Sequence, residues 1–262
     1  MKILVSAKRV TDPDARIRLK PDLSGIDLEG VEYKLNPFCE NAIEEALRLQ
    51  SAYGGEVIAF MVGTSEAEGD LRKAMAMGAA RGIRVDAKDE DLDSDLVARI
   101  VVKLYEKEKP DLILLGKQAI DGDSNQVSQL VAEYLGIASA TNVSHPEGSA
   151  GMQSDKPGMK LEGNKLFAMR EVDGGSEVLE MELPAIASAD LRLNEPRLPK
   201  LPMILAAKRK PLEALSMADL GVENKVRVKT VALGSPPVRK AGIKVKSVQE
   251  LVDKLADEAR VL

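Results

Sequence analysis

The chain has 262 residues, with 42 acidic and 37 basic side chains and a formal net charge of −5. Aromatic residues make up 3% of the sequence and Trp is absent, which argues against a base-stacking platform or a duplex-binding surface. One cysteine excludes an internal disulfide and a metal site built from several thiolates. The sequence shows no apolar run of membrane-spanning length and no signal or transit peptide, so we expect a soluble cytoplasmic protein without nucleic-acid partner or membrane insertion.

The charges are distributed unevenly along the chain. Residues 191–262 contain 15 basic and 8 acidic side chains, so the first 190 residues carry the acidic excess. A basic C-terminal part beside an acidic body indicates a protein partner rather than a polyanion. A solvated basic surface without a partner is the alternative that composition leaves open.

Short apolar strands alternate with amphipathic helices in the first half of the chain. Strands are predicted at 2–7, 56–62, 82–85 and 111–115, and helices at 36–49, 65–77, 94–107 and 125–135. Ser65 is expected to cap the second of these helices, and Gly78 and Gly136 to end the second and fourth. Because the strands are apolar on both faces, the pattern predicts an α/β fold with a doubly wound, mostly parallel sheet between helices.

The pattern changes after residue 136. A glycine-rich loop over 148–163 is expected to lead into a β-hairpin, whose strands at 165–170 and 177–183 flank the turn residues 173–175. A further strand is predicted at 185–189. We therefore expect residues 1–190 to form a nucleotide-binding α/β domain, and residues 191–262 to form a separate partner-recognition segment and C-terminal arm.

Three prolines mark the start of this second part. Pro196, Pro199 and Pro202 recur at every third position, and each fixes its own φ and disfavours helix at the residue before it. The segment is therefore predicted to be extended and stiff, as a docking element or as a plain surface linker. A final amphipathic helix is predicted at 247–259 with Ser247 as its cap.

The loop after the strand at 111–115 is the best candidate for a small-molecule site. Ligands of open α/β sheets bind beyond the carboxyl ends of strands, and a helix N-terminus suits a phosphate. Asp121 and Asp123 count against phosphate binding unless they point away or cap the backbone, and an ordinary strand–helix loop is the alternative. The segment comprises Gly116, Lys117, Gln118, Ala119, Ile120, Asp121, Gly122, Asp123, Ser124, Asn125, Gln126 and Val127.

We find no catalytic constellation in the sequence. Cys39 lies near a predicted helix N-terminus, where the pKa of a thiol falls, but no His is near it in sequence. His145, in a predicted loop, is the single histidine and has no second ligand or partner carboxylate nearby. Motifs of serine hydrolases, zinc proteases and phosphate-binding Walker loops are absent from the sequence, so the chain is not expected to be an enzyme.

Several motifs in order along the chain resemble those of the β subunit of electron-transfer flavoproteins. The most specific is LRLNEPR at 191–197, followed by two Leu-Pro pairs. Residues 3–10, 36–40, 74–79, 116–121 and 170–185 also match the family pattern. The resemblance implies an adenine-nucleotide α-hydrolase-like fold and an extended arm that wraps an α subunit in a heterodimer.

The resemblance also implies two cofactors. This subunit would bind AMP structurally, and the α subunit would hold most of an FAD that carries the electrons. The implied contacts are Ser6, Asn36, Pro37, Phe38, Cys39, Val62 and the loop at 116–127, with Asn125 and Gln126 at the phosphate and Phe38 near the isoalloxazine. Many relatives have Thr at Val127, and some have a Tyr where Pro13 stands, so two contacts are in doubt.

Partners follow from the same resemblance. Residues 197–206 match the recognition loop for acyl-CoA and related dehydrogenases, with Leu201 as the anchor. The electrons would pass on to a membrane quinone oxidoreductase. The implied partner-binding residues are Arg197, Leu198, Pro199, Lys200, Leu201, Pro202, Met203 and Ile204.

Two other functions stay open at this stage. One is a β subunit of the electron-bifurcating branch, which binds a second FAD and NADH; residues 121–123, Asp-Gly-Asp, favour it, whereas Phe38 and the LRLNEPR motif disfavour it. The other is a nucleotide-hydrolysing α/β enzyme. That enzyme would need a glycine- and serine-rich loop after the first strand, where this sequence has Ala-Lys-Arg-Val-Thr at 7–11.

Overall fold

The computed structural model of the protein describes residues 1–145, 157–239 and 241–262. Contacts divide the chain into two units. The larger comprises Met1–Ile17 and Leu28–Lys229, and the smaller comprises Arg18–Asp27 and Thr230–Leu262. The division predicted at residue 190 separates a nucleotide-binding part from a partner-binding part, and it stays a prediction.

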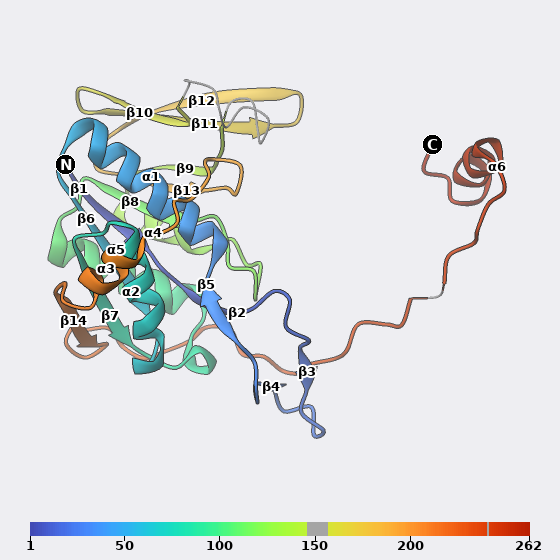
Figure 1. The fold of residues 1–262 in the computed structure, drawn as a ribbon, viewed down its shortest axis with the longest axis horizontal. Helices are drawn as coiled ribbons and strands as arrows, with labels where there is room; N and C mark the ends of the chain where they lie inside the picture. Colours follow the sequence, from blue (N-terminus) through green and yellow to red (C-terminus); the bar gives the residue numbers. More distant parts are fainter. Residues whose placement is uncertain (146–156, 240) are drawn as a thin grey trace. The chain divides into compact units, whose positions relative to one another are not determined.

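A ten-stranded, mostly parallel sheet forms the centre of the larger unit (Figure 1). Its order is β10-β11-β9-β13-β8-β1-β6-β7-β14, with β12 paired to β11. The parallel strands are β1 Lys2–Ser6, β6 Glu56–Val62, β7 Arg81–Asp86, β8 Leu112–Gly116, β9 Ala138–Val143, β13 Ala185–Ala189 and β14 Leu212–Ser216. The antiparallel strands are β10 Met159–Glu162, β11 Lys165–Val172 and β12 Gly175–Glu182.

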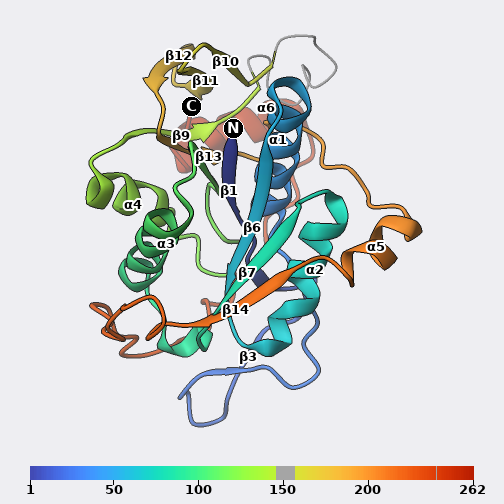
Figure 2. The same cartoon turned by 90° about the vertical axis from the view of Figure 1, so that its left-hand side faces the viewer.

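Helices cover both faces of the sheet, as expected for a doubly wound fold (Figure 2). α1 Pro37–Tyr53 and α2 Glu68–Met77 pack on one face, and α3 Ser94–Glu108 and α4 Val127–Leu135 pack on the other. Successive side chains of a strand point to opposite faces, so Ile3 and Val5 of β1 join the first core and Leu4 joins the second. The predicted α/β fold class is confirmed.

Most predicted elements lie where the sequence placed them, and the differences have local causes. Ser65 does not cap an α-helix, because a 3-10 turn over Ser65–Ala67 precedes α2. Asn125 has a φ of 46°, which is left-handed, so α4 begins at Val127 instead of residue 125. Of the predicted loop over 148–163, residues 148–156 lie outside the described residues, and part of the rest forms β10.

The prediction of an extended segment after residue 196 is wrong for its second half. Residues Leu201–Ala207 form the helix α5, which packs beside α2. Pro202 lies in the first turn of α5, where a helix tolerates proline because the missing N–H would have no partner in the helix. β14 was also not predicted, and it pairs in parallel with β7 at the edge of the sheet.

Two short antiparallel ladders complete the strands. β2 Arg9–Thr11 pairs with β5 Tyr33–Leu35 in the larger unit. In the smaller unit, β3 Arg18–Leu19 pairs with β4 Ile26–Asp27.

The last helix of the chain belongs to the smaller unit. α6 Val248–Asp253 continues into a π-helical turn over Lys254–Glu258. The Ser247 hydroxyl accepts a hydrogen bond from the Glu250 N–H at 3.1 Å, which confirms the predicted cap. Among the described residues, every helix is too short or too polar to cross a bilayer.

Glu45 is the most deeply buried acidic residue of α1. Glu45 is 1% exposed, and burial raises its pKa to about 7, although Arg48 and a hydrogen bond from Asn194 act in the opposite direction. The Asn194 amide donates to Glu45 Oε2 at 3.0 Å. Ionisation of the Glu45 carboxyl group therefore destabilises the folded state.

Glu45→Gln should remove a pH dependence of stability. Between the ordinary pKa of 4.5 and about 7, the folded state binds more protons at Glu45 than the unfolded state, so the free energy of unfolding falls as pH rises. Each pKa unit corresponds to about 1.4 kcal/mol, which limits this contribution to about 3 kcal/mol. Urea unfolding of wild type and Glu45→Gln at pH 5 and pH 8 measures it; equal pH slopes would contradict the assignment.

Candidate functional site

The sequence-predicted site residues gather at the topological switch point of the sheet. From β1 the chain proceeds to β6 and β7 on one side, and then returns to β8 on the other side of β1. Ser6 ends β1 and Gly116 ends β8, and the Gly116 N–H donates to Ser6 Oγ at 3.1 Å. Val62 ends β6 at the same edge of the sheet. Open α/β sheets bind ligands at this position.

Asn36 connects the first turn of α1 to the loop that follows β8. Its side chain is 1% exposed, donates to the Gln118 carbonyl at 2.8 Å and accepts from the Ile120 N–H at 3.3 Å. Its backbone carbonyl accepts from the Cys39 and Glu40 N–H groups at the start of the helix. One buried amide therefore fixes the loop relative to α1.

Gly116 allows this close approach of β8 to α1. A Cβ atom at this position would lie 2.8 Å from the carbonyl carbon of Phe38 and 2.9 Å from the Cys39 nitrogen. Both are backbone atoms, so a side chain at position 116 would require the first turn of α1 to shift. Pro37 opens this turn, and Phe38 is 7% exposed behind it.

Cys39 does not have the lowered pKa predicted from its position at a helix N-terminus. The thiol is buried, and desolvation raises its pKa despite hydrogen bonds from Asn36 and Ser6 that act in the opposite direction. The Sγ atom lies 3.4 Å from the Asn36 amide nitrogen and 3.6 Å from Ser6 Oγ. A buried, protonated thiol is a packing residue in this site.

Both carboxylates of the loop have partners inside the protein. Lys8 Nζ contacts the two carboxylate oxygens of Asp121 at 2.7 and 2.8 Å. Asp123 accepts from the Gln118 side-chain amide at 2.8 Å. The charge of Asp121 is therefore offset, whereas Asp123 has only a neutral amide as its partner and its negative charge still counts against a phosphate nearby.

Lys8 was not predicted to be part of this site. A signal was present, since Lys8 comes two residues after the end of β1, at the edge of the sheet from which the loop with Asp121 leaves β8. A similar contact holds the start of the loop: Lys117 pairs with Asp190 at 3.0 Å, and its N–H donates to the Ala189 carbonyl.

The end of the loop presents the N-terminus of α4. Asp123 and Asn125 have φ values of 48° and 46°, a region that Asp and Asn tolerate better than most residues. The first turn of α4 contains no acidic residue, so its positive dipole end is not offset. Gln129 donates to Asn125 Oδ1 at 3.4 Å, which leaves the amide group of Asn125 to donate toward a ligand.

Residues 197–206, here called the docking segment, expose apolar side chains. Leu198 is 91% and Leu201 68% exposed, and Met203, Ile204 and Leu205 are also exposed. The predicted exposure of Leu201 is confirmed. Ala207, which ends α5 directly after this segment, is 1% exposed and belongs to the core of the larger unit.

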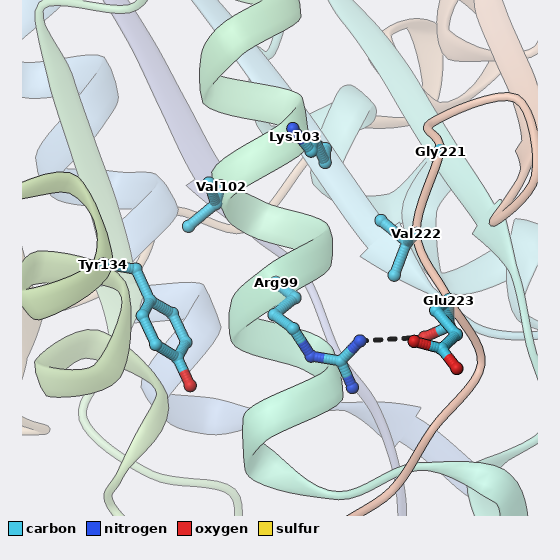
Figure 3. A pocket seen from close by; sticks show the side chains of 7 residues that line it. All are labelled: Arg99, Val102, Lys103, Tyr134, Gly221, Val222 and Glu223. Atoms are coloured by element: carbon cyan, nitrogen blue, oxygen red, sulfur yellow. Dashed lines mark hydrogen bonds between the residues drawn. The ribbon is translucent and has the colours of Figure 1, made fainter.

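A cavity of about 150 Å³ lies elsewhere, between α3, α4 and the residues after β14 (Figure 3). Its wall contains apolar groups, and Arg99 donates to the Glu223 carbonyl at 2.8 Å. The sequence analysis named none of its residues. They are Arg99, Val102, Lys103, Tyr134, Gly221, Val222 and Glu223.

Comparison with known proteins gives a consistent result. A family model described as the electron transfer flavoprotein domain matches residues 25–220. The chain is 44% identical over 265 residues to electron transfer flavoprotein subunit beta of Homo sapiens, covering 100% of this chain and 99% of that protein. It is 45% identical over 263 residues to the mitochondrial electron transfer flavoprotein subunit beta of Arabidopsis thaliana, and 44% identical over 265 residues to electron transfer flavoprotein subunit beta of Bradyrhizobium diazoefficiens. Both chains are fully covered in each case.

Gly116→Ala should destabilise the protein through the contact with α1. The new methyl group would overlap backbone atoms, and overpacking of this kind costs about 1–3 kcal/mol. Gly122→Ala is the matched control in the same loop, since the nearest atom is Ser124 Oγ at 3.8 Å. Chemical unfolding of both variants measures the difference; equal stability would contradict the close-packing assignment.

Proposed function

The chain belongs to the electron transfer flavoprotein family as a β subunit, and we propose from this premise that it is an electron-carrier subunit rather than an enzyme. It binds AMP structurally, helps an α subunit to hold FAD, and docks acyl-CoA and related dehydrogenases. The electrons then pass to a membrane quinone oxidoreductase. The flavin supplies the redox chemistry when bound, and this chain supplies binding and orientation.

The observation that carries the nucleotide proposal is the loop after β8, which is fixed to α1 at the switch point. Asn36 holds its middle, and Lys8 offsets the charge of Asp121. Ser6 and Val62 would contact the adenosine at the ends of their strands. The free N–H groups at the start of α4, with Asn125 and Gln126, would bind the phosphate.

The docking proposal is supported by the exposed apolar face of α5. A monomeric surface does not gain stability from a row of exposed Leu, Met and Ile side chains, and such a face suits a partner's apolar pocket. Lys200 at its base would steer an acidic partner and add little net affinity, whereas the charge of Arg197 is offset by Glu44.

A β subunit of the electron-bifurcating type is the second candidate. Asp121 and Asp123 around Gly122 favour it, because this triplet resembles the sequence in that branch. Such a subunit would bind FAD in place of AMP. A nucleotide-hydrolysing enzyme is less well supported, since residues 7–11 lack the glycines that a pyrophosphate loop needs. The expected cytoplasmic location stays a prediction, and the Arabidopsis thaliana relative is named mitochondrial.

Co-expression with an α subunit tests the proposed function. We expect a yellow 1:1 complex from which acid releases one AMP and one FAD. Two FAD molecules per complex would favour the bifurcating type. A β chain that purifies alone as a monomer and is fully active in electron transfer would contradict the carrier-subunit proposal.

Asn125→Asp should weaken nucleotide retention. The substitution places a negative charge at the phosphate end, while Asp, like Asn, tolerates the left-handed backbone at this position. A ligand at 100 times its dissociation constant stabilises a protein by about 2.7 kcal/mol, so bound AMP and melting temperature should fall together.

The flavin spectrum of Asn125→Asp should survive in the folded complex. Asn125→Gly serves as the control, since it removes the amide without adding charge and should retain more AMP. Full AMP occupancy in Asn125→Asp would show that the phosphate lies elsewhere.

Leu201→Ala should weaken electron transfer from a dehydrogenase. Burying a leucine is worth roughly 1.5–3 kcal/mol, which corresponds to a ten- to hundredfold loss of apparent affinity. AMP content, FAD content and melting temperature should stay near the wild-type values, because the side chain is 68% exposed. Val178→Ala, at an exposed position on β12, is the control and should leave turnover unchanged. Loss of flavin with normal turnover kinetics would make Leu201 a structural residue.

A further inference from the structure

The docking segment is held at its far end by polar contacts with α2. Arg72 of α2 donates to the Ala207 and Lys210 carbonyls, both at 2.8 Å. Lys210 Nζ in turn donates to the Met75 and Ala79 carbonyls at 2.7 Å. The end of α5 is therefore fixed to a helix that itself packs on the sheet.

The near end is held by α1 through two asparagines. The Asn41 amide donates to the Asn194 carbonyl at 2.7 Å and to the Leu191 carbonyl at 3.2 Å. The Asn194 amide donates back to the Asn41 carbonyl at 3.1 Å and to Glu45. Asn41 and Asn194 are 3% and 4% exposed, so these bonds are shielded from water. They fix the main chain just before the docking segment.

A charged contact completes the near end. Glu44 of α1 accepts three hydrogen bonds from Arg197: from the backbone N–H at 3.1 Å, from Nε at 2.7 Å and from Nη2 at 2.9 Å. The pKa of Arg197 is raised, chiefly by this hydrogen bonding to Glu44. Glu44 is 7% exposed, so the pair is partly desolvated and geometrically specific.

We propose that Asn41, Glu44 and Glu45 of α1, together with Asn194 and Arg197, form a clamp that positions α5 for partner docking. These are positioning residues, because they act on the partner through the path of the docking segment. The inference rests on the docking function proposed above. It means that residues of α1 determine how Leu201, on α5, is exposed to a partner.

The length of the connection makes the clamp effective. Only Leu198, Pro199 and Lys200 separate Arg197 from the first residue of α5, and Pro199 has a restricted φ. A shift at Arg197 is therefore transmitted to Leu201 instead of being absorbed by a flexible linker. A segment fixed at both ends also loses less conformational freedom when it binds, and this lowers the entropic cost of association.

Substitution of Glu44 tests the clamp in the complete α/β complex. Glu44→Ala removes the acceptor for Arg197, and Glu44→Gln keeps an acceptor oxygen without the charge. With an acyl-CoA dehydrogenase that reduces the wild-type complex, Glu44→Ala should raise KM for the complex about tenfold, the scale for loss of one charge-assisted contact. The kcat, AMP content and FAD content should stay within about twofold, and Glu44→Gln should be intermediate.

Gln50→Ala is the matched control on the same helix, since Gln50 donates to Gly55 and not to the docking segment. Amide hydrogen exchange over residues 201–207 in Glu44→Gln gives a second measurement, and faster exchange than in the wild type is expected. Suppose that Leu201→Ala raises KM as expected. An unchanged KM in the Glu44 variants, or unchanged hydrogen exchange over residues 201–207, would then overturn the clamp. An unchanged KM in Leu201→Ala would instead overturn the docking function itself.

Discussion

The close contact between the end of β8 and the first turn of α1 is the constraint on which the rest of the site depends. Gly116 permits it, because any Cβ there would meet the backbone of α1. Asn36 then bridges the same two elements with its buried side chain. Backbone and amide groups thereby fix the position of α1 relative to the sheet. Neither α1 nor β8 has much freedom to shift. Asn41, Glu44 and Glu45 follow on the same helix, so the loop after β8 and residues 197–206 are both held by α1.

Burial outweighs the helix dipole at Cys39, in the first turn of α1. A helix N-terminus contributes typically 0.3–1 kcal/mol to an exposed negative charge. Removing a charge from water costs several kcal/mol unless partners replace the solvent. The pKa of Cys39 is therefore raised although the thiol lies in the first turn of α1. In the middle of the same helix, burial also raises the pKa of Glu45 despite the attraction of Arg48. Asp121, by contrast, lies in a partly exposed loop and is paired with Lys8.

The sequence predicted the alternating core as far as β8 and α4, because each of these strands and helices carries its own pattern, whereas β9 was not predicted. β6 and β13 were placed at their observed bounds, since both are short apolar runs between turn residues. β14 and α5 were missed for a different reason. Leu212–Ser216 is half polar and becomes a strand by pairing with β7, and the helix over Leu201–Ala207 forms against α2 despite Pro202. The Lys8–Asp121 pair joins residues 113 positions apart, so only the strand order brings them together.

The LRLNEPR motif contains buried residues and partly exposed residues, and the local sequence alone does not distinguish them. Leu193 and Asn194 are buried, and they hold the chain against the larger unit. Arg197 is paired with Glu44 although its side chain stays 40% exposed. Among the apolar side chains of residues 191–207, the most exposed are Leu198 and Leu201, which come after the motif. A surface that binds a partner through apolar side chains has two requirements. The apolar side chains must stay exposed in the free subunit, where they add no stability. Polar contacts behind them must keep them from packing onto the core. The motif supplies the second requirement, since its buried and paired polar residues directly precede the exposed apolar side chains of α5.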